Sequence, residues 1–154
     1  MKTLHIRTPR DDEWPAILGL ADTALPWDPA GNREWLENRK RFSGRRRHYV
    51  AEGTPSGPVV AYGAIEEGPD PGSFRVFVVM DPALLVTETA GLLYERLVAE
   101  LAALGARSAW VREYARDQAV LAFFSRLGFV ERDRFSPQGH EEMVVMAKKL
   151  AQSA

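Results

Sequence analysis

The stretch DQAVLAFFSRLGF, residues 117–129, decides the fold. Asp117 is of a residue type that caps helix N-termini. Glycine ends helices because it adopts a positive φ without a steric penalty, and Gly128 stands where this helix would end. The apolar residues between them recur at the spacing of one helical face: Val120, Phe123, Phe124 and Leu127. The stretch predicts a short helix with an aromatic inner face, followed at Phe129 by a strand.

A longer helix and a buried strand precede this stretch. The helix is predicted to begin near Thr87 or Thr89 and to end at Gly105. Its leucines form one stripe: Leu93, Leu97, Leu101 and Leu104. Residues 108–112 then read as a strand. Strands that alternate with helices in this way predict crossover connections in the second half of the chain.

The first half of the chain favours antiparallel pairing. Residues 4–7 form a short predicted strand, and a helix over 12–24 follows with Pro15 in its first turn. Asn32 is the predicted cap of a second helix. The next strands, 48–52, 59–67 and 74–80, are separated by Gly/Pro-rich turns and predict a meander, and strands 129–135 and 143–147 close the chain.

The element order is therefore strand, two helices, three strands, helix, strand, helix, two strands. It predicts an α/β (α+β) fold with a mixed, mostly antiparallel central sheet of about seven strands and about four helices on both faces.

Length and composition narrow the classes of protein. The 154 residues predict a single domain, 1–154, and the absence of cysteine excludes disulfide scaffolds, Cys-ligated metal sites and a catalytic thiolate. No apolar run approaches the roughly 20 residues of a membrane span, and the N-terminus has no signal-peptide pattern. We expect a cytoplasmic protein without membrane contacts. The three histidines have no metal-ligand or triad spacing, so no metal is expected.

The stretch 117–129, together with the element order, resembles the GNAT superfamily of acyl-CoA-dependent N-acyltransferases over about residues 4–150. In that family a helix led by Asn ends in an aromatic pair and then Gly-Phe. Here Asp117 replaces the Asn, Phe124 stands where Tyr is usual, and Gly128-Phe129 is retained.

The resemblance implies transfer of an acetyl or other acyl group from acyl-CoA to a primary amine, either a small molecule or a protein amino group. It implies acetyl-CoA as co-substrate, lying beside Val78, Val79 and Met80 with its thiol end near Phe124. The pyrophosphate would lie near Thr87, Glu88, Thr89 and Ala90, and Asp117 would also contact the cofactor. Many members form homodimers, but nothing in the sequence specifies an interface.

The pyrophosphate loop departs from the family pattern, Arg/Gln-x-x-Gly-x-Gly/Ala. The pattern falls on residues 85–90, where only Ala90 fits. A carboxylate about 5 Å from a phosphate charge costs roughly 3 kcal/mol at an effective dielectric constant near 20, more than the roughly 0.3–1 kcal/mol that a helix N-terminus supplies. Glu88 therefore opposes pyrophosphate binding unless it turns into solvent. Alternatively, Thr87 and Glu88 are an ordinary helix start.

The catalytic groups are fewer than the reaction needs. N-acyl transfer requires loss of a proton from the amine and delivery of a proton to the thiolate, and Phe124 cannot supply one. Tyr114 is the nearest phenol in sequence, and Glu66 and Glu67 end a strand where a base could face the acceptor. The alternative is that Tyr114 packs in a loop and the two glutamates are solvated.

Two further groups of residues are open to more than one interpretation. The basic run 39–48 suits a helix end and an edge strand, and also suits phosphate contacts or an anionic acceptor. Trp27 and Trp35 fit packing anchors or the wall of an acceptor pocket. The net charge of −1 does not favour nucleic acid.

Three functions stay in view from the sequence. The first is an acyl-CoA-dependent N-acetyltransferase. The second is a degenerate GNAT-fold domain with weak or no CoA binding that serves regulation or interaction, which would account for Leu85, Glu88 and Phe124 together. The third is a nucleic-acid adaptor that uses the basic run.

Overall fold

The computed structural model describes residues 4–139 and 141–150. Within these residues the strands are β1 (His5–Arg7), β2 (Arg46–Glu52), β3 (Val59–Glu67), β4 (Ser73–Met80), β5 (Ser108–Tyr114), β6 (Val130–Phe135) and β7 (Met143–Lys149). The helices are α1 (Trp14–Ala24), α2 (Pro29–Arg41), α3 (Glu88–Ala103) and α4 (Gln118–Arg126). Two short 3-10 helices, η1 (Asp11–Glu13) and η2 (Pro82–Val86), precede α1 and α3.

The strands form one seven-stranded sheet in the order β1-β2-β3-β4-β5-β7-β6. Every neighbouring pair is antiparallel except β4 and β5, which run parallel and pair over three positions only, Ser73–Arg75 with Ser108–Trp110. Beyond Arg75, β4 continues along β3, whereas β5 continues along β7. The predicted mixed, mostly antiparallel sheet is confirmed, and its two halves diverge from one short parallel contact.

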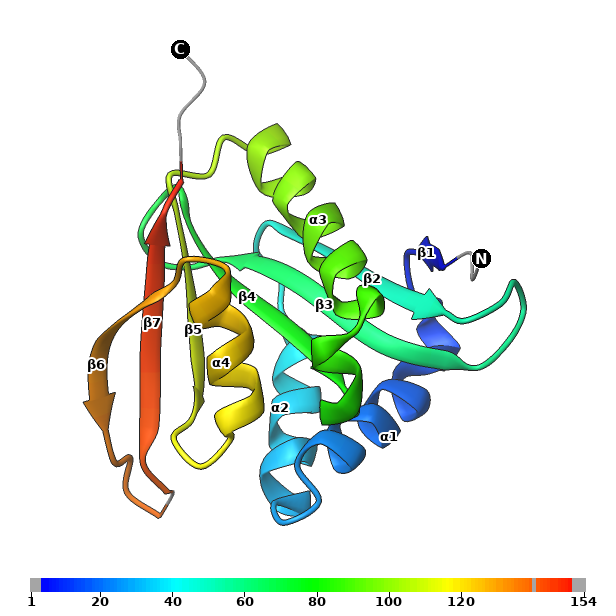
Figure 1. Cartoon of the computed structure of the whole chain (residues 1–154), viewed down its shortest axis with the longest axis horizontal. Helices are drawn as coiled ribbons and strands as arrows, with labels where there is room; N and C mark the ends of the chain where they lie inside the picture. The colour runs from blue at the N-terminus through cyan, green and yellow to red at the C-terminus, as the bar shows by residue number, and fades with distance from the viewer. Residues whose placement is uncertain (1–3, 140, 151–154) are drawn as a thin grey trace.

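Helices cover both faces of the sheet, as Figure 1 shows: α3 and α4 lie in front of it, and α1 and α2 behind it. The larger hydrophobic cluster lies under α3 and α4 and the smaller one under α1 and α2. Alternate residues of β4 divide between the two clusters, Val76 with the first and Phe77 with the second, because successive strand residues point to opposite faces.

Helix α3 packs closely on the middle of the sheet. Leu93, Leu97 and Leu101 are buried, as their spacing predicts, and Leu104 packs at the edge of the same cluster. Gly63 on β3 makes the approach possible, since a Cβ atom there would lie 3.0 Å from the Leu93 side chain. The leucine stripe thus holds the β4-to-β5 crossover against β3.

The helix predicted between Asp117 and Gly128 is confirmed as α4. The rings of Phe123 and Phe124 lie 5.2 Å apart, and Phe124 lies 5.1 Å from Phe129, both in edge-to-face geometry. Tyr94 of α3 contacts all three rings. Gly128 ends the turn with φ +94°. The stretch therefore joins the two helices on this face through one aromatic cluster.

Helix α2 begins earlier than predicted, and its cap is Asp28 rather than Asn32. The Asp28 carboxylate accepts the backbone N–H of Gly31 at 3.1 Å, and Pro29 occupies the first turn, where its missing N–H costs nothing. Asn32 lies inside the helix and is buried. Its amide donates to Asp22 and to the carbonyl of Leu25, at 3.0 and 2.9 Å, which ties α2 to the end of α1.

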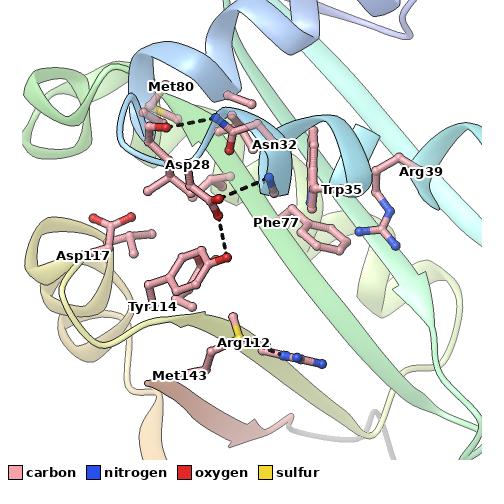
Figure 2. Close-up of a pocket in the computed structure, with 18 of the residues that line it drawn as sticks. Asp28, Asn32, Trp35, Arg39, Phe77, Met80, Arg112, Tyr114, Asp117 and Met143 are labelled. Carbon is pink, nitrogen blue, oxygen red and sulfur yellow. Dashed lines mark hydrogen bonds between the residues drawn. The ribbon is translucent and has the colours of Figure 1, made fainter. Parts of the chain in front are cut away.

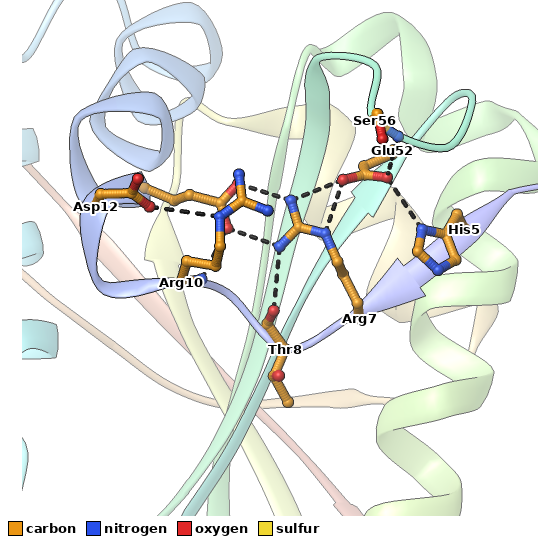
Figure 3. A network of polar contacts seen from close by, with 8 residues as sticks. His5, Arg7, Thr8, Arg10, Asp12, Glu52 and Ser56 are labelled. Atoms are coloured by element: carbon orange, nitrogen blue, oxygen red, sulfur yellow. Dashed lines mark hydrogen bonds and ion pairs between the residues drawn. The ribbon is translucent and has the colours of Figure 1, made fainter.

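A network of charges fastens β1 to the sheet (Figure 3). Arg7 donates to Glu13 at 2.7 Å and to Glu52 at 2.7 Å, and Glu52 also bonds His5 at 3.0 Å. These bonds lower the pKa of Glu13, chiefly through Arg7, and that of Glu52, chiefly through His5 and Arg7, each to about 2. Both carboxylates are therefore ionised at neutral pH and hold the three-residue strand in place.

The aromatic cluster under α4 is expected to contribute strongly to stability. Phe124 is fully buried, so Phe124→Ala should lower the free energy of unfolding by about 3–5 kcal/mol through lost contacts and a residual cavity. Val130 is 54% exposed and serves as the control. Val130→Ala should change the free energy of unfolding by about 0.5 kcal/mol or less. Urea denaturation followed by circular dichroism measures both, and equal losses would contradict the assignment.

Candidate functional site

A cavity of about 270 Å³ opens where β4 and β5 separate. Its walls come from α1 and α2 on one side, from η2 and the first turn of α4 on the other, and from the two diverging strands. Because the gap passes between the strands, the cavity reaches residues on both faces of the sheet. Figure 2 shows side chains from these segments converging on it.

Strand β4 contributes its C-terminal half to the cavity. Val78, Val79 and Met80, which the resemblance implies as cofactor-binding residues, all line it. Their backbone pairs with β3 along one edge only. Since β5 has already turned away, the other edge of β4 faces the gap with its N–H and C=O groups available to an extended ligand.

Tyr114, a predicted catalytic residue, ends β5 and lines the cavity. Its hydroxyl donates to Asp28 at 2.6 Å, and the ring of Trp27 lies 4.8 Å from its own ring, edge to face. Burial and the Asp28 carboxylate raise the pKa of Tyr114, so the phenol keeps its proton at neutral pH. The predicted packing role and a chemical role are both compatible with this position.

Two more carboxyl groups line the cavity. Asp117 lines it at the start of α4, where the sequence predicts a binding residue, and burial raises its pKa. Glu113 lines it as well, although sequence reasoning missed it. Burial, with the Asp117 carboxylate beside it, raises the pKa of Glu113 to about 8. The predicted strand ended at residue 112, whereas β5 continues to Tyr114. An acidic residue that directly follows a predicted buried strand was the available signal.

The remaining cofactor residues from the sequence lie outside the cavity. Phe124 is fully buried in the aromatic cluster under α4. Thr87 precedes α3, and Glu88 and Thr89 begin it, with Glu88 exposed. Ala90 is buried in the core. Leu85 in η2 does line the cavity, and its side chain belongs to the hydrophobic core.

Glu66 and Glu67, predicted as candidate bases, are held in ion pairs away from the cavity. Glu66 is buried and lies 2.8 Å from Arg39. Glu67 lies 2.9 Å from Arg45 and also accepts the backbone N–H of Gly72. Both carboxylates are thus occupied in joining β3 to its surroundings.

Most arginines of the basic run 39–48 form ion pairs with carboxylates of the same chain. Arg39 and Arg46 meet Glu66, Arg45 meets Glu67, and Arg47 lies 3.7 Å from Glu100 of α3. Such pairing suits a helix end against an edge strand, the structural interpretation of the run. Trp35 does line the cavity, whereas Trp27 packs on Tyr114.

Two kinds of feature are absent from the described part of the chain. Residues 4–139 and 141–150 contain no group of three or more His, Cys, Asp or Glu side chains placed to hold a metal ion. Within the same residues no helix is both long and apolar enough to cross a membrane.

Comparison with known proteins gives matches in structure only. No protein-family model matches the sequence, and no curated protein does. The ribosomal-protein-S18-alanine N-acetyltransferase of Escherichia coli superposes with a TM-score of 0.73 at 20% identity, over 99% of this chain and 97% of that one. The PaiA N-acetyltransferase of Thermoplasma acidophilum, in complex with coenzyme A, gives 0.73 at 12% identity over 96% and 99%. A GCN5-related N-acetyltransferase of Kribbella flavida gives 0.72 at 17% identity over 96% and 98%. The chain thus has the GNAT fold that the sequence resemblance implied.

The carboxyl of Glu113 should make stability depend on pH. Its folded pKa of about 8 lies above its ordinary 4.5, so the folded chain retains a proton that the unfolded chain releases between these values. The contribution of Glu113 to the free energy of unfolding should therefore fall as pH rises from 5 to 8, whereas His48, whose pKa burial lowers to about 4, contributes a rise that ends near pH 6.5. Glu113→Gln should remove only the Glu113 contribution, so the difference between the two profiles is what tests it. Thermal denaturation at pH 5 to 9 measures this, with the exposed Glu95→Gln as control. Parallel profiles for the wild type and Glu113→Gln would contradict the assignment.

Proposed function

We propose that this protein transfers an acyl group, acetyl in the simplest case, from acyl-CoA to the primary amine of a small acceptor. The observation that carries the proposal is the cavity between β4 and β5, which joins an open strand edge to the Tyr114–Asp28 pair. The GNAT fold of N-acetyltransferases such as those of Escherichia coli and Thermoplasma acidophilum supports it.

The residues along β4 and α3 fit an acyl-CoA. An extended chain with amide groups can hydrogen-bond to the open edge of Val78, Val79 and Met80 as an added strand would. The first turn of α3 has no side-chain cap, because the Thr87 hydroxyl donates to the carbonyl of Leu84 at 2.6 Å. Its backbone N–H groups are therefore left for the negative charge of a pyrophosphate.

The bound thioester would supply an acyl carbon open to attack by an amine. The nitrogen–carbon bond forms as the carbon–sulfur bond breaks, so one proton must leave the nitrogen and one must reach the sulfur. Tyr114 holds a proton that it can donate to the sulfur, and Asp28, 2.6 Å away, can receive the proton from the amine and return it to the phenol. The pair would thus complete the reaction without net gain or loss of protons.

A second function rests on the departures from the family pattern. Leu85 is buried in the core, Glu88 begins α3 with its side chain exposed, and Phe124 is fully buried. Leu85 and Phe124 offer no polar group to CoA, and the carboxylate of Glu88 carries the same sign of charge as a pyrophosphate. A domain that has kept the fold for regulation or interaction would show these features, and a measurement of CoA binding separates the two functions.

Acetyl-CoA should stabilise the folded protein. At 100 times its dissociation constant a ligand adds about 2.7 kcal/mol, which is on the order of 5–10 °C in melting temperature for a chain of this size. Glu88→Gln should tighten binding by about two- to fivefold by removing an exposed like charge, whereas Glu95→Gln in the middle of α3 should not. Thermal-shift titration with acetyl-CoA, with ATP as the anion control, measures both. The absence of a CoA-specific shift would favour the non-catalytic domain.

Removal of the Tyr114 hydroxyl should slow transfer without weakening CoA binding. Tyr114→Phe keeps the ring against Trp27 and deletes the donor to Asp28, so kcat should fall by about 100-fold, the lower range for a positioned acid or base. Release of free CoA thiol measures the rate, and acetyl-CoA titration gives the affinity. An unchanged kcat would assign proton transfer to another group.

A further inference from the structure

The cavity contains arginines that the proposed proton-transfer chemistry does not use. Arg39, Arg75 and Arg112 all line it. Arg39 is paired with Glu66 at 2.8 Å. Among the described residues no carboxylate lies within ion-pair distance of Arg75 or Arg112. Glu34, an exposed acidic residue of α2 that also lines the cavity, is not paired with any of the three.

Of the two arginines without an ion pair, Arg75 lies against aromatic rings and has a buried Nε without a hydrogen-bond partner. Its guanidinium lies over the ring of Phe77, 4.3 Å from the centroid, and 5.5 Å from the centroid of Trp110. Its Nε is buried without a hydrogen-bond partner. Burial lowers the pKa of Arg75 to about 10, so the side chain is still a cation at neutral pH. A buried N–H group without an acceptor is costly unless a ligand supplies one.

The positions of the neighbouring arginines add to this positive charge. Arg39 lies over the same Phe77 ring, 4.5 Å from its centroid. Arg112 donates from Nε to the thioether of Met143 at 3.3 Å, a weak acceptor that leaves its charge unneutralised. Arg75 is also the last β4 residue to pair with β5, so this charge lies at the apex of the gap between the strands.

Charge is therefore divided between the two ends of the cavity. Asp28 begins α2 and Arg39 comes 11 residues later, a distance of about 16 Å along a helix. Figure 2 shows Asp28, Tyr114 and Asp117 toward one side of the view and Arg39 toward the other, with the rings of Trp35 and Phe77 between Asp28 and Arg39 and with Arg112 below these rings. A ligand that spans the cavity meets acidic groups at one end and arginine at the other.

We propose that Arg75, assisted by Arg112, binds an anionic group of the acceptor, so that the acceptor is an amine that also carries a carboxylate or a phosphonate. The inference rests on the proposed function, because it orients the amine toward Asp28 and Tyr114. A planar guanidinium matches both kinds of oxyanion. The volume of about 270 Å³ selects a small molecule of amino-acid size.

The test compares acceptors that share an amine and differ in the anionic group. With acetyl-CoA, each of the twenty L-amino acids is compared with its carboxamide, and 2-aminoethylphosphonate with ethanolamine, by release of CoA thiol. The best anionic acceptor should have a KM at least about 10-fold below that of its uncharged partner, since a charge-assisted hydrogen bond is lost in the latter. A lower KM for an amino acid would identify a carboxylate as the bound group, and a lower KM for 2-aminoethylphosphonate would identify a phosphonate.

Substitution of Arg75 assigns the preference to this residue. Arg75→Met should raise the KM for the anionic acceptor by about 10- to 100-fold and should change the KM for the uncharged amine by a much smaller factor. Arg75→Lys keeps the positive charge but loses the two-pronged guanidinium, so its KM for the anionic acceptor should lie between those of the wild type and Arg75→Met. Arg132→Met, on the exposed strand β6, is the matched control and should change nothing. Thermal denaturation of each variant checks that it is folded.

The outcomes separate this inference from the proposed function. Equal turnover of acids and carboxamides, unaffected by Arg75→Met, would overturn the anion site and leave the transferase. If no amine is acetylated, melting temperatures with the same amino acids and phosphonate decide: a shift in the wild type that Arg75→Met abolishes would keep the anion site and reject transfer. The absence of both turnover and shift would overturn the anion site.

Discussion

The arrangement of this molecule depends on one short contact, the parallel pairing of Ser73–Arg75 with Ser108–Trp110. Three paired positions are enough to align the two halves of the sheet, and too few to keep β4 and β5 together to their ends. Each strand then follows its other neighbour, β3 or β7, because those antiparallel pairings are longer. The gap that results supplies the cavity, the open edge of β4 and the separation of the acidic and basic groups that line it.

The hydrophobic packing on either side protects this gap from closing. On one face the leucines of α3 and the aromatic cluster of α4 form the larger core. This core packs against both β4 and β5. On the other face Phe77 and Leu36 belong to a smaller core under α1 and α2. The cavity is lined by residues of α1 and α2, among them Trp35, and also by Tyr114 and the three arginines.

Much of the fold could be predicted because its signals are local. The spacing of Leu93, Leu97 and Leu101 identifies α3, the residues of 117–129 identify α4, and Gly128 marks the end of that helix at a positive φ. Position 28 shows where such reasoning fails. The sequence analysis chose Asn32 as the cap, whereas Asp28, followed by Pro29, caps the helix and the amide of Asn32 bonds the end of α1.

By itself the sequence determined the order and type of the elements and the mixed sheet, because periodicity, caps and turns act between neighbours in the chain. The family resemblance, and not these patterns, implied Val78, Val79, Met80 and Asp117 as cofactor residues, and Tyr114 was a candidate from its position alone. Only the tertiary structure decided which charged side chains form pairs and which lie in the cavity. It buried Glu66 against Arg39, paired Glu67 with Arg45, and brought Asp28 to Tyr114 from 86 residues away. It also left the buried Nε of Arg75 without a hydrogen-bond acceptor. The physical reason is that ion pairing and burial depend on distances across the sheet, which no pattern of neighbouring residues contains.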